Sequence, residues 1–240
     1  MPRTPPRPHG HGYTADEIRA LRADLCRADP ALVVADALVP AFAWRSRPAT
    51  YAGLLKLVAE QQVSVASAAA IWKRIEEGLG TVTPAKVVAA GTEHMRTLGL
   101  SKPKARYAVE IAQAAIDGRV DFKALATLDD DEAVASLTSL IGIGRWTAEA
   151  FLIGAYGRTD FFPAADIALQ EAVRLIDGGE RRPTEKELYV RAERWKPFRA
   201  LAAHLLWAFY TAVKTGAVAF TPPPVHSAPA AGRRAARKPR

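Results

Sequence analysis

A Gly-Ile-Gly turn at residues 142–144 constrains the fold of this chain more than any other feature of its sequence. Three residues are too few for a loose loop, and the two glycines permit the sharp reversal that a tight turn needs. Apolar or small side chains at helical spacing lie on both sides of the turn: Leu137, Leu140, Ile141, Thr147, Phe151 and Ala155. Residues 131–156 are therefore predicted to form two helices joined as a hairpin, with Ile143 packed between them.

The same turn exposes backbone groups that can bind an anion. The first N–H groups of a helix have no partner within the helix, and they carry the positive end of its dipole. The residues predicted to bind a phosphate at this helix start are Gly142, Gly144, Arg145 and Thr147. A single DNA phosphate fits such a site and is held without readout of base sequence. The alternative is an ordinary helical turn, which the flanking leucines and the sequence RWTA disfavour.

Helical patterns separated by short linkers fill the rest of the chain. We expect about ten helices and no strand, which makes the fold class all-α. One long helix is predicted over residues 51–80, because apolar residues recur at helical spacing until Gly78 and Gly80. Residues 13–220 are expected to form one compact helical domain.

The charge of the chain is concentrated at its two ends. Residues 1–12 and 221–240 contain seven basic residues and no acidic one, whereas residues 13–220 contain 26 basic and 25 acidic residues. Both ends are rich in proline and arginine, and they are predicted to be disordered basic tails. Two roles stay open for them: sequence-independent attraction to nucleic acid, or a contribution to solubility alone. Any basic face on residues 13–220 must come from the arrangement of side chains, because their net charge is close to zero.

Several classes of protein are disfavoured by what the sequence lacks. No stretch approaches the ~20 apolar residues of a membrane span, and the N-terminus has no apolar signal-peptide core. We therefore expect a cytoplasmic protein without membrane contact. The single cysteine, Cys26, excludes an internal disulfide, a cysteine-based zinc site and a four-cysteine iron–sulfur cluster. The five histidines have no metal-binding spacing, which argues against a zinc deaminase or a metal nuclease.

The sequence LIGIGRWTAEAF (140–151), followed by FFPAADIALQ (161–170), resembles the helix-hairpin-helix DNA glycosylases with a trailing catalytic aspartate. Within that superfamily it is most similar to the bacterial 3-methyladenine-DNA glycosylase II type. Further matches lie at 29–34, 57–72, 99–107 and 193–207, so the resemblance covers roughly residues 28–215. It implies two helical lobes with a DNA-binding cleft between them. It also implies a structural Na⁺ or K⁺ held by the backbone carbonyls of Thr138, Leu140 and Ile143, with no cofactor required for catalysis.

The resemblance assigns roles to five side chains. Asp166 matches the catalytic aspartate, and Trp146 and Trp207 match aromatic residues of the base pocket. Gln62 matches the residue that wedges into the duplex where a base has left, with Gln61 as the near alternative. The other tryptophans, Trp44, Trp72 and Trp195, are expected in the core.

The chemistry of alkylated DNA suits these residue types. Alkylation at N3 or N7 makes a purine cationic, and indole faces attract planar cations. A cationic base is a good leaving group, so the enzyme mainly needs a negative charge beside the sugar as oxocarbenium character develops. Asp166 supplies that charge, can orient the attacking water and also stands where a helix N-cap belongs. In bifunctional relatives a lysine that attacks the sugar occupies the position of Trp146.

The sequence therefore predicts a monofunctional hydrolase that removes alkylated purines and leaves an abasic site. Its expected partner is double-stranded DNA with alkylated bases, bound by a monomer in the bacterial cytoplasm, in association with the nucleoid. Two alternatives stay open: a glycosylase for deaminated or etheno purines, and a non-catalytic helix-hairpin-helix DNA-binding protein. A non-catalytic DNA-binding protein would gain nothing from Asp166, because a carboxylate that faces DNA repels the phosphates.

Overall fold

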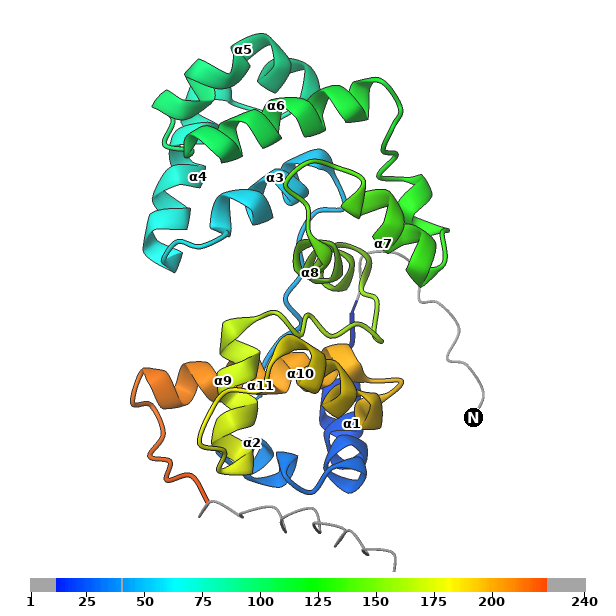
Figure 1. Cartoon of the computed structure of the whole chain (residues 1–240), viewed down its shortest axis with the longest axis vertical. Helices are drawn as coiled ribbons and strands as arrows, with labels where there is room; N and C mark the ends of the chain where they lie inside the picture. Colours follow the sequence, from blue (N-terminus) through cyan, green and yellow to red (C-terminus); the bar gives the residue numbers. More distant parts are fainter. Residues whose placement is uncertain (1–11, 40, 224–240) are drawn as a thin grey trace, which may run out of the picture.

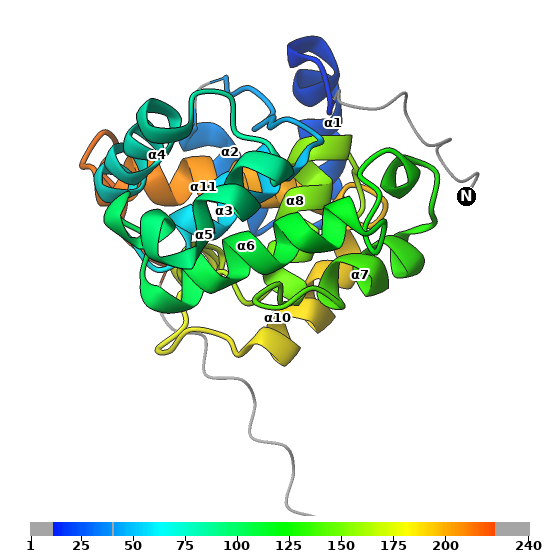
Figure 2. The ribbon, with the colours of Figure 1, turned by 90° about the horizontal axis from the view of Figure 1, so that it is seen from above.

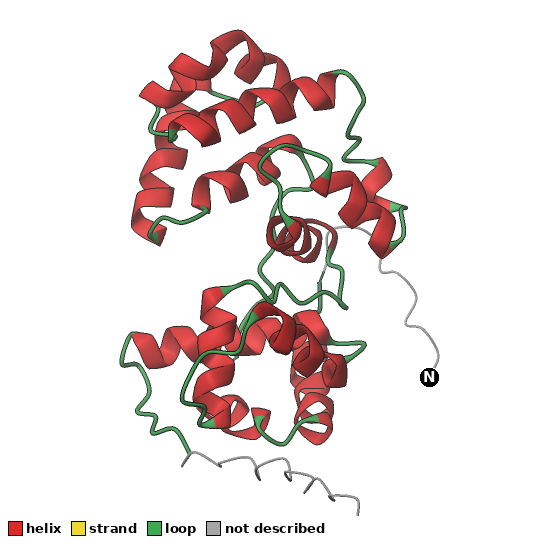
Figure 3. Ribbon diagram, in the orientation of Figure 1, coloured by secondary structure: helices red, strands yellow, loops and turns green. Residues whose placement is uncertain are grey.

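The computed structural model describes residues 12–39 and 41–223, and this part of the chain contains helices and loops but no strands. Figure 3 shows this all-helical composition. The all-α prediction is therefore confirmed. Among the described helices, none has the length and apolar character required to cross a bilayer.

The helices form two groups, which appear as the upper and lower halves of Figure 1. The lower group takes helices from both ends of the chain: α1 (Ala15–Ala28), α2 (Leu32–Leu38), α9 (Ile167–Asp177), α10 (Glu185–Ala192) and α11 (Arg199–Lys214). The upper group is continuous in sequence: α3 (Tyr51–Glu60), α4 (Val65–Leu79), α5 (Pro84–Thr97), α6 (Lys102–Ile116), α7 (Asp130–Thr138) and α8 (Arg145–Tyr156). Helix α11 packs on α9 and α2, whereas α6 packs on α5 and α3.

Helix α8 is the part of the upper group that lies nearest the lower one, and it packs on α3 and α7 (Figure 1 and Figure 2). Most of its residues are buried, because it has neighbours on several sides. The loop at 41–50 ties α8 to the lower group: Trp44 Nε1 donates to the Ile153 carbonyl at 3.1 Å, and Arg47 N donates to the Gly154 carbonyl at 2.9 Å. The predicted hairpin is confirmed as α7, a short turn and α8, with Ile143 buried in the core.

The prediction of one long helix over 51–80 is wrong. The chain leaves helical geometry at 61–64, between α3 and α4, and Ser64 caps α4 by accepting a hydrogen bond from Ser67 N at 3.1 Å. Contacts from distant segments stabilise the break. Gln61 Nε2 donates to Thr147 Oγ1 at 2.8 Å, and Lys104 Nζ donates to the Ala59 carbonyl at 3.0 Å and to the Gln61 carbonyl.

Most of the two predicted tails lies outside the described residues. The exceptions are residue 12 and residues 221–223. Gly12 is buried against Trp44, where an added Cβ would come within 2.1 Å of the indole. The Pro223 carbonyl lies against Gly178 at the end of α9. Gly12 and Pro223, which lie just outside the predicted limits of 13–220, thus contact the helical domain.

Candidate active site

Asp166 is the N-cap of α9 and lies beside Trp146 of α8. Its Oδ1 accepts hydrogen bonds from Ala168 N at 2.8 Å and Leu169 N at 3.1 Å. Its Oδ2 accepts a hydrogen bond from Trp146 Nε1 at 3.1 Å. Three N–H donors thus fix the carboxylate, and lone pairs remain on both oxygens for a further ligand. The structure brings together two predicted site residues that are 20 positions apart in the sequence.

Of the five tryptophans only Trp146 is half-buried, whereas the other four, including Trp207, are buried. Trp195 is completely buried, and Trp44 and Trp72 are each 8% exposed, which confirms their placement in the core. Trp146 is only half-buried. Trp207, on α11, is 9% exposed and contacts the ring of His204, with centroids 5.4 Å apart.

Arg45 connects Trp207 with Asp166, and it had no assigned role in the sequence analysis. Its guanidinium carbon lies 4.9 Å from the centroid of the Trp207 ring, within the range of a cation–π contact. Desolvation lowers the pKa of Arg45, and the negative charge of Asp166 opposes that effect. Asp166 and Trp207 therefore act on the same guanidinium. No motif marks Arg45 in the sequence, because it lies in an irregular loop.

The two glutamines at the end of α3 have different environments. Gln61 is held by its hydrogen bond to Thr147, whose side chain is 2% exposed. Gln62 is exposed and has a φ of 54°, the one positive value at a non-glycine residue in the described chain. Left-handed backbone at a residue with a Cβ costs about 1–2 kcal/mol, and such strain often marks functional positions. Of the two, Gln62 has the side chain that is available to a ligand.

The glycine turn has the local geometry that an anion-binding hairpin requires. Gly142 has a φ of 77°, and an added Cβ would lie 2.3 Å from the Tyr107 ring, so only glycine fits there. Gly144 is the N-cap of α8 and offers no side chain to cap it. The first backbone hydrogen bond into α8 runs from Ala148 N to the Gly144 carbonyl. The N–H groups of the first turn are therefore left for an external acceptor.

A matching family model and related proteins identify the superfamily. The model described as "HhH-GPD superfamily base excision DNA repair protein" matches residues 55–198. The chain belongs to this superfamily. It is 34% identical over 161 residues to DNA-3-methyladenine glycosylase 1 of Schizosaccharomyces pombe, which covers 65% of this chain and 71% of that protein.

Solved structures of family members agree with this assignment. A DNA-3-methyladenine glycosidase from Bacillus halodurans superposes with a TM-score of 0.70 at 26% identity, covering 85% of this chain and 93% of the other. The S. pombe enzyme Mag1 in complex with abasic DNA superposes with a TM-score of 0.66 at 30% identity, covering 75% and 89% respectively.

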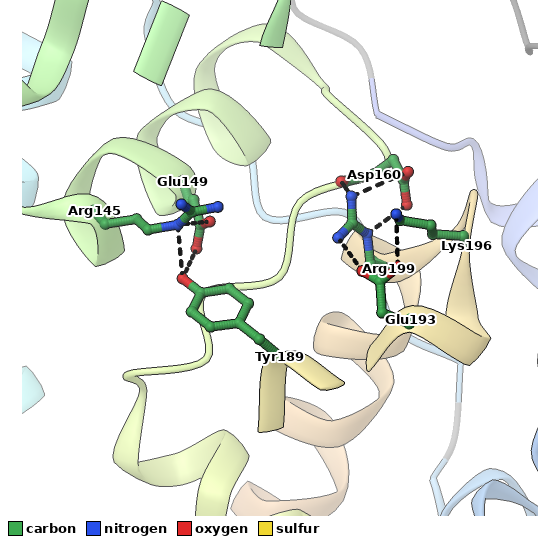
Figure 4. Close-up of polar contacts among 7 residues, drawn as sticks. All are labelled: Arg145, Glu149, Asp160, Tyr189, Glu193, Lys196 and Arg199. Atoms are coloured by element: carbon green, nitrogen blue, oxygen red, sulfur yellow. Dashed lines mark hydrogen bonds and ion pairs between the residues drawn. The ribbon is translucent and has the colours of Figure 1, made fainter. Parts of the chain in front are cut away.

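In this member of the HhH-GPD superfamily, a polar network centred on the buried Glu149 holds the start of α8 against α10 (Figure 4). Arg145 Nε donates to Glu149 Oε1 at 2.9 Å and to the Tyr189 hydroxyl at 3.0 Å, and that hydroxyl donates to Glu149 Oε2 at 3.0 Å. Burial raises the pKa of Glu149, whose side chain is 1% exposed, and Arg145 opposes this shift.

Two of the predicted phosphate-binding residues differ in what their side chains can reach. The side chain of Thr147 is buried against Gln61, so a phosphate contact there would use the backbone N–H group. Arg145 bonds to Glu149 and Tyr189 through Nε, and its side chain is 58% exposed, so its terminal guanidinium nitrogens are accessible to a phosphate.

A second cluster in Figure 4 holds the segment that leads to Asp166. Arg199, at the start of α11, donates to Asp160 Oδ1 at 2.8 Å and to the Asp160 carbonyl at 2.6 Å. Arg199 also pairs with Glu193 at 3.3 Å. These bonds fix the loop between α8 and α9 to the helix that carries Trp207, so Asp166 and Trp207 are held by one framework.

The hairpin turn offers oxygen donors of the type that hard cations prefer. Among the described hydrogen bonds, the Thr138 and Ile143 carbonyls accept none, whereas the Leu140 carbonyl accepts one from Ile143 N at 3.1 Å and keeps a second lone pair. In the described residues, histidine, cysteine and acidic side chains form no cluster of three that could hold a metal ion. Each of the three predicted carbonyls therefore has a lone pair that no described hydrogen bond uses.

Proposed function

We propose that this protein is a monofunctional DNA glycosylase that flips alkylated purines out of duplex DNA and hydrolyses the N-glycosidic bond. The observation that carries the proposal is the hydrogen bond between Trp146 and Asp166. It combines an aromatic surface for the base with a carboxylate for the sugar at one place. Membership of a base excision repair superfamily and similarity to proteins named 3-methyladenine glycosylases support it.

Asp166 would stabilise the transition state by its charge. As the bond between base and sugar lengthens, positive charge develops on the sugar ring. A carboxylate fixed in advance by Ala168, Leu169 and Trp146 stabilises that charge without reorganisation during the reaction. The remaining lone pairs of Asp166 can also orient the water that attacks the sugar carbon.

Base flipping requires that the gap in the duplex be filled and the strand be held. Flipping costs a few kcal/mol, and the cost is least for a damaged pair. Gln62, exposed at the break between α3 and α4, would enter the gap with polar edges that imitate a base. The first turn of α8, after Gly144, would bind a phosphate of the DNA strand through backbone N–H groups.

A cation in the hairpin would strengthen the phosphate contact. The Thr138, Leu140 and Ile143 carbonyls would hold a Na⁺ or K⁺, which adds positive charge beside the N-terminus of α8. Its contribution would be to DNA affinity, and no chemical step depends on it.

The absence of strand cleavage follows from the residue at position 146. A bifunctional glycosylase needs a lysine there to form a Schiff base with the sugar. Trp146 cannot act as a nucleophile. Borohydride, which reduces a Schiff base to a stable adduct, should therefore trap no covalent complex between protein and DNA, and a trapped adduct would contradict the monofunctional mechanism.

The proposal is tested by incubating the protein with methylated duplex DNA and measuring free bases by chromatography. Release of 3-methyladenine or 7-methylguanine, with intact strands that break only on alkaline treatment of the abasic sites, is expected. Duplexes that contain hypoxanthine or ethenoadenine are tested in parallel. Release of these bases, without release of methylated purines, would show that deaminated or etheno purines are the substrates instead. DNA binding without release of any base would leave only a DNA-binding protein.

A further inference from the structure

The guanidinium of Arg45 occupies a surface that the proposed function gives to the flipped base. It lies 4.9 Å from the centroid of Trp207, and Trp207 is only 9% exposed. His204 contacts the indole from within the core. A base that stacks on the ring under Arg45 must therefore first displace the guanidinium.

The backbone of Arg45 is fixed while its side chain is held weakly. Arg45 N donates to His204 Nε2 at 3.0 Å, and the other ring nitrogen of His204 contacts the Ala200 carbonyl of α11 at 2.7 Å. The His204 ring also stacks on Trp44 at 4.1 Å. By contrast, within the described chain the guanidinium has no carboxylate within ion-pair distance and contacts Trp207 only through the ring face. The exposed side chain of Arg45 is therefore anchored beside the site at its backbone, with the cation–π contact to Trp207 at its other end.

We propose that Arg45 is a specificity-determining residue that lowers the preference of the base pocket for cationic purines relative to neutral ones. The inference rests on the proposed function in taking Trp207 as a wall of that pocket. A neutral purine can be stacked by the displaced guanidinium on its outer face, because arginine stacks well on bases. A cationic purine is repelled by the same group. The pocket therefore accepts neutral lesions more readily than two tryptophans and an aspartate alone would.

The test compares the binding of two purines that differ in charge and carry no cleavable sugar. The probes are 3,9-dimethyladeninium, a cation, and neutral 9-methyladenine, titrated against the full chain with tryptophan fluorescence as the readout. The quantity of interest is the ratio of their affinities. The cost of moving Arg45 off the indole applies to both probes, so it cancels in the ratio.

Arg45→Met removes the charge and keeps the side-chain length and the backbone bond to His204. The affinity ratio of cationic to neutral probe should rise about tenfold, the equivalent of ~1.4 kcal/mol. Arg45→Gln should give a similar rise, which guards against a folding defect specific to methionine. Arg47→Met is the matched control: Arg47 has the same charge, lies two residues along the loop and pairs with Glu60 at 3.4 Å. Its ratio should stay within twofold of the wild type.

Three outcomes would overturn the proposal. An unchanged ratio in both Arg45 variants would show that the guanidinium does not discriminate by charge. An equal rise of the affinity ratio in Arg47→Met would show that the effect comes from the overall positive charge of the loop and not from the position of Arg45. Failure of both purines to bind any of the proteins would remove the pocket on which the inference rests. Release of 7-methylguanine from DNA by the wild type separates the cases, because that activity stands even where the ratio does not change.

Discussion

Replacing Gly144 by alanine tests the anion-binding role of the hairpin with little disturbance of the fold. The residue has φ −85° and ψ 173°, which alanine adopts freely, and an added Cβ meets no atom of the described chain within 4 Å. As an N-cap, alanine is less favourable than glycine, and the loss of stability should stay below about 1 kcal/mol. The new methyl group would project beside the first N–H groups of α8, where we place the phosphate.

The expected effect on binding follows from the hydrogen bonds that are lost. Hydrogen bonds to a charged group contribute about 1.5–3 kcal/mol, so losing roughly 2 kcal/mol would weaken DNA binding about thirtyfold. Fluorescence anisotropy with two undamaged duplexes of unrelated sequence measures this, and both should be affected equally because a phosphate contact reads no sequence.

Two other glycines complete the experiment. Gly179→Ala is the control, because its Cβ would meet its nearest neighbour, the Arg181 carbonyl, at 3.4 Å, an ordinary contact. Its DNA affinity should match the wild type. Gly142→Ala should instead reduce stability, since its Cβ would collide with Tyr107. Wild-type affinity in Gly144→Ala would refute the assignment of the phosphate to this turn.

Two further predictions concern His204 and Gln62. Burial lowers the pKa of His204 to about 4, so the unfolded state binds more protons below its pKa of ~6.5, and stability should fall by about 2 kcal/mol between pH 7 and pH 5. Urea unfolding of wild type and His204→Gln at both pH values isolates this term, and an identical pH dependence in the two proteins would contradict it. Gln62→Gly suits the φ of 54° and removes the side chain, so base release should slow at least tenfold on duplex DNA and little on single strands, where there is no gap to fill. Equal slowing on both substrates would argue against a wedge, and Gln61→Ala cannot replace this test because it also breaks the bond to Thr147.

Local patterns in the sequence were sufficient to predict the hairpin and the cap at Asp166. Gly142 and Gly144 lie between two clear helical patterns, and an aspartate directly before an amphipathic segment is a strong N-cap signal. Both features depend on residues close together in the chain. Their prediction from sequence therefore did not require knowledge of the packing.

The break at 61–64 and the position of Arg45 depend on distant residues, so local patterns could not reveal them. Gln61 is held by Thr147 and Lys104, which lie 86 and 43 positions away. The apolar spacing continues through the break, so periodicity alone extends the helix. Arg45 is brought to Trp207 by long-range packing: its backbone N–H donates to His204 of α11, and its guanidinium lies over the Trp207 ring. No pattern in the loop indicates that contact.

The measurement that tests the account most directly is the single-turnover rate of base release by Asp166→Asn. Asparagine is also an effective N-cap, so α9 should keep its start while the site loses its negative charge. Two unit charges about 4 Å apart interact with ~4 kcal/mol at an effective dielectric constant near 20, which corresponds to about a thousandfold in rate.

Duplex DNA containing 7-methylguanine is the substrate, and affinity for undamaged duplex is measured in parallel. We predict that the rate of base release falls about a thousandfold, while the affinity for undamaged duplex stays within twofold of the wild type. A rate within tenfold of the wild type, at unchanged affinity, would contradict the catalytic role of Asp166.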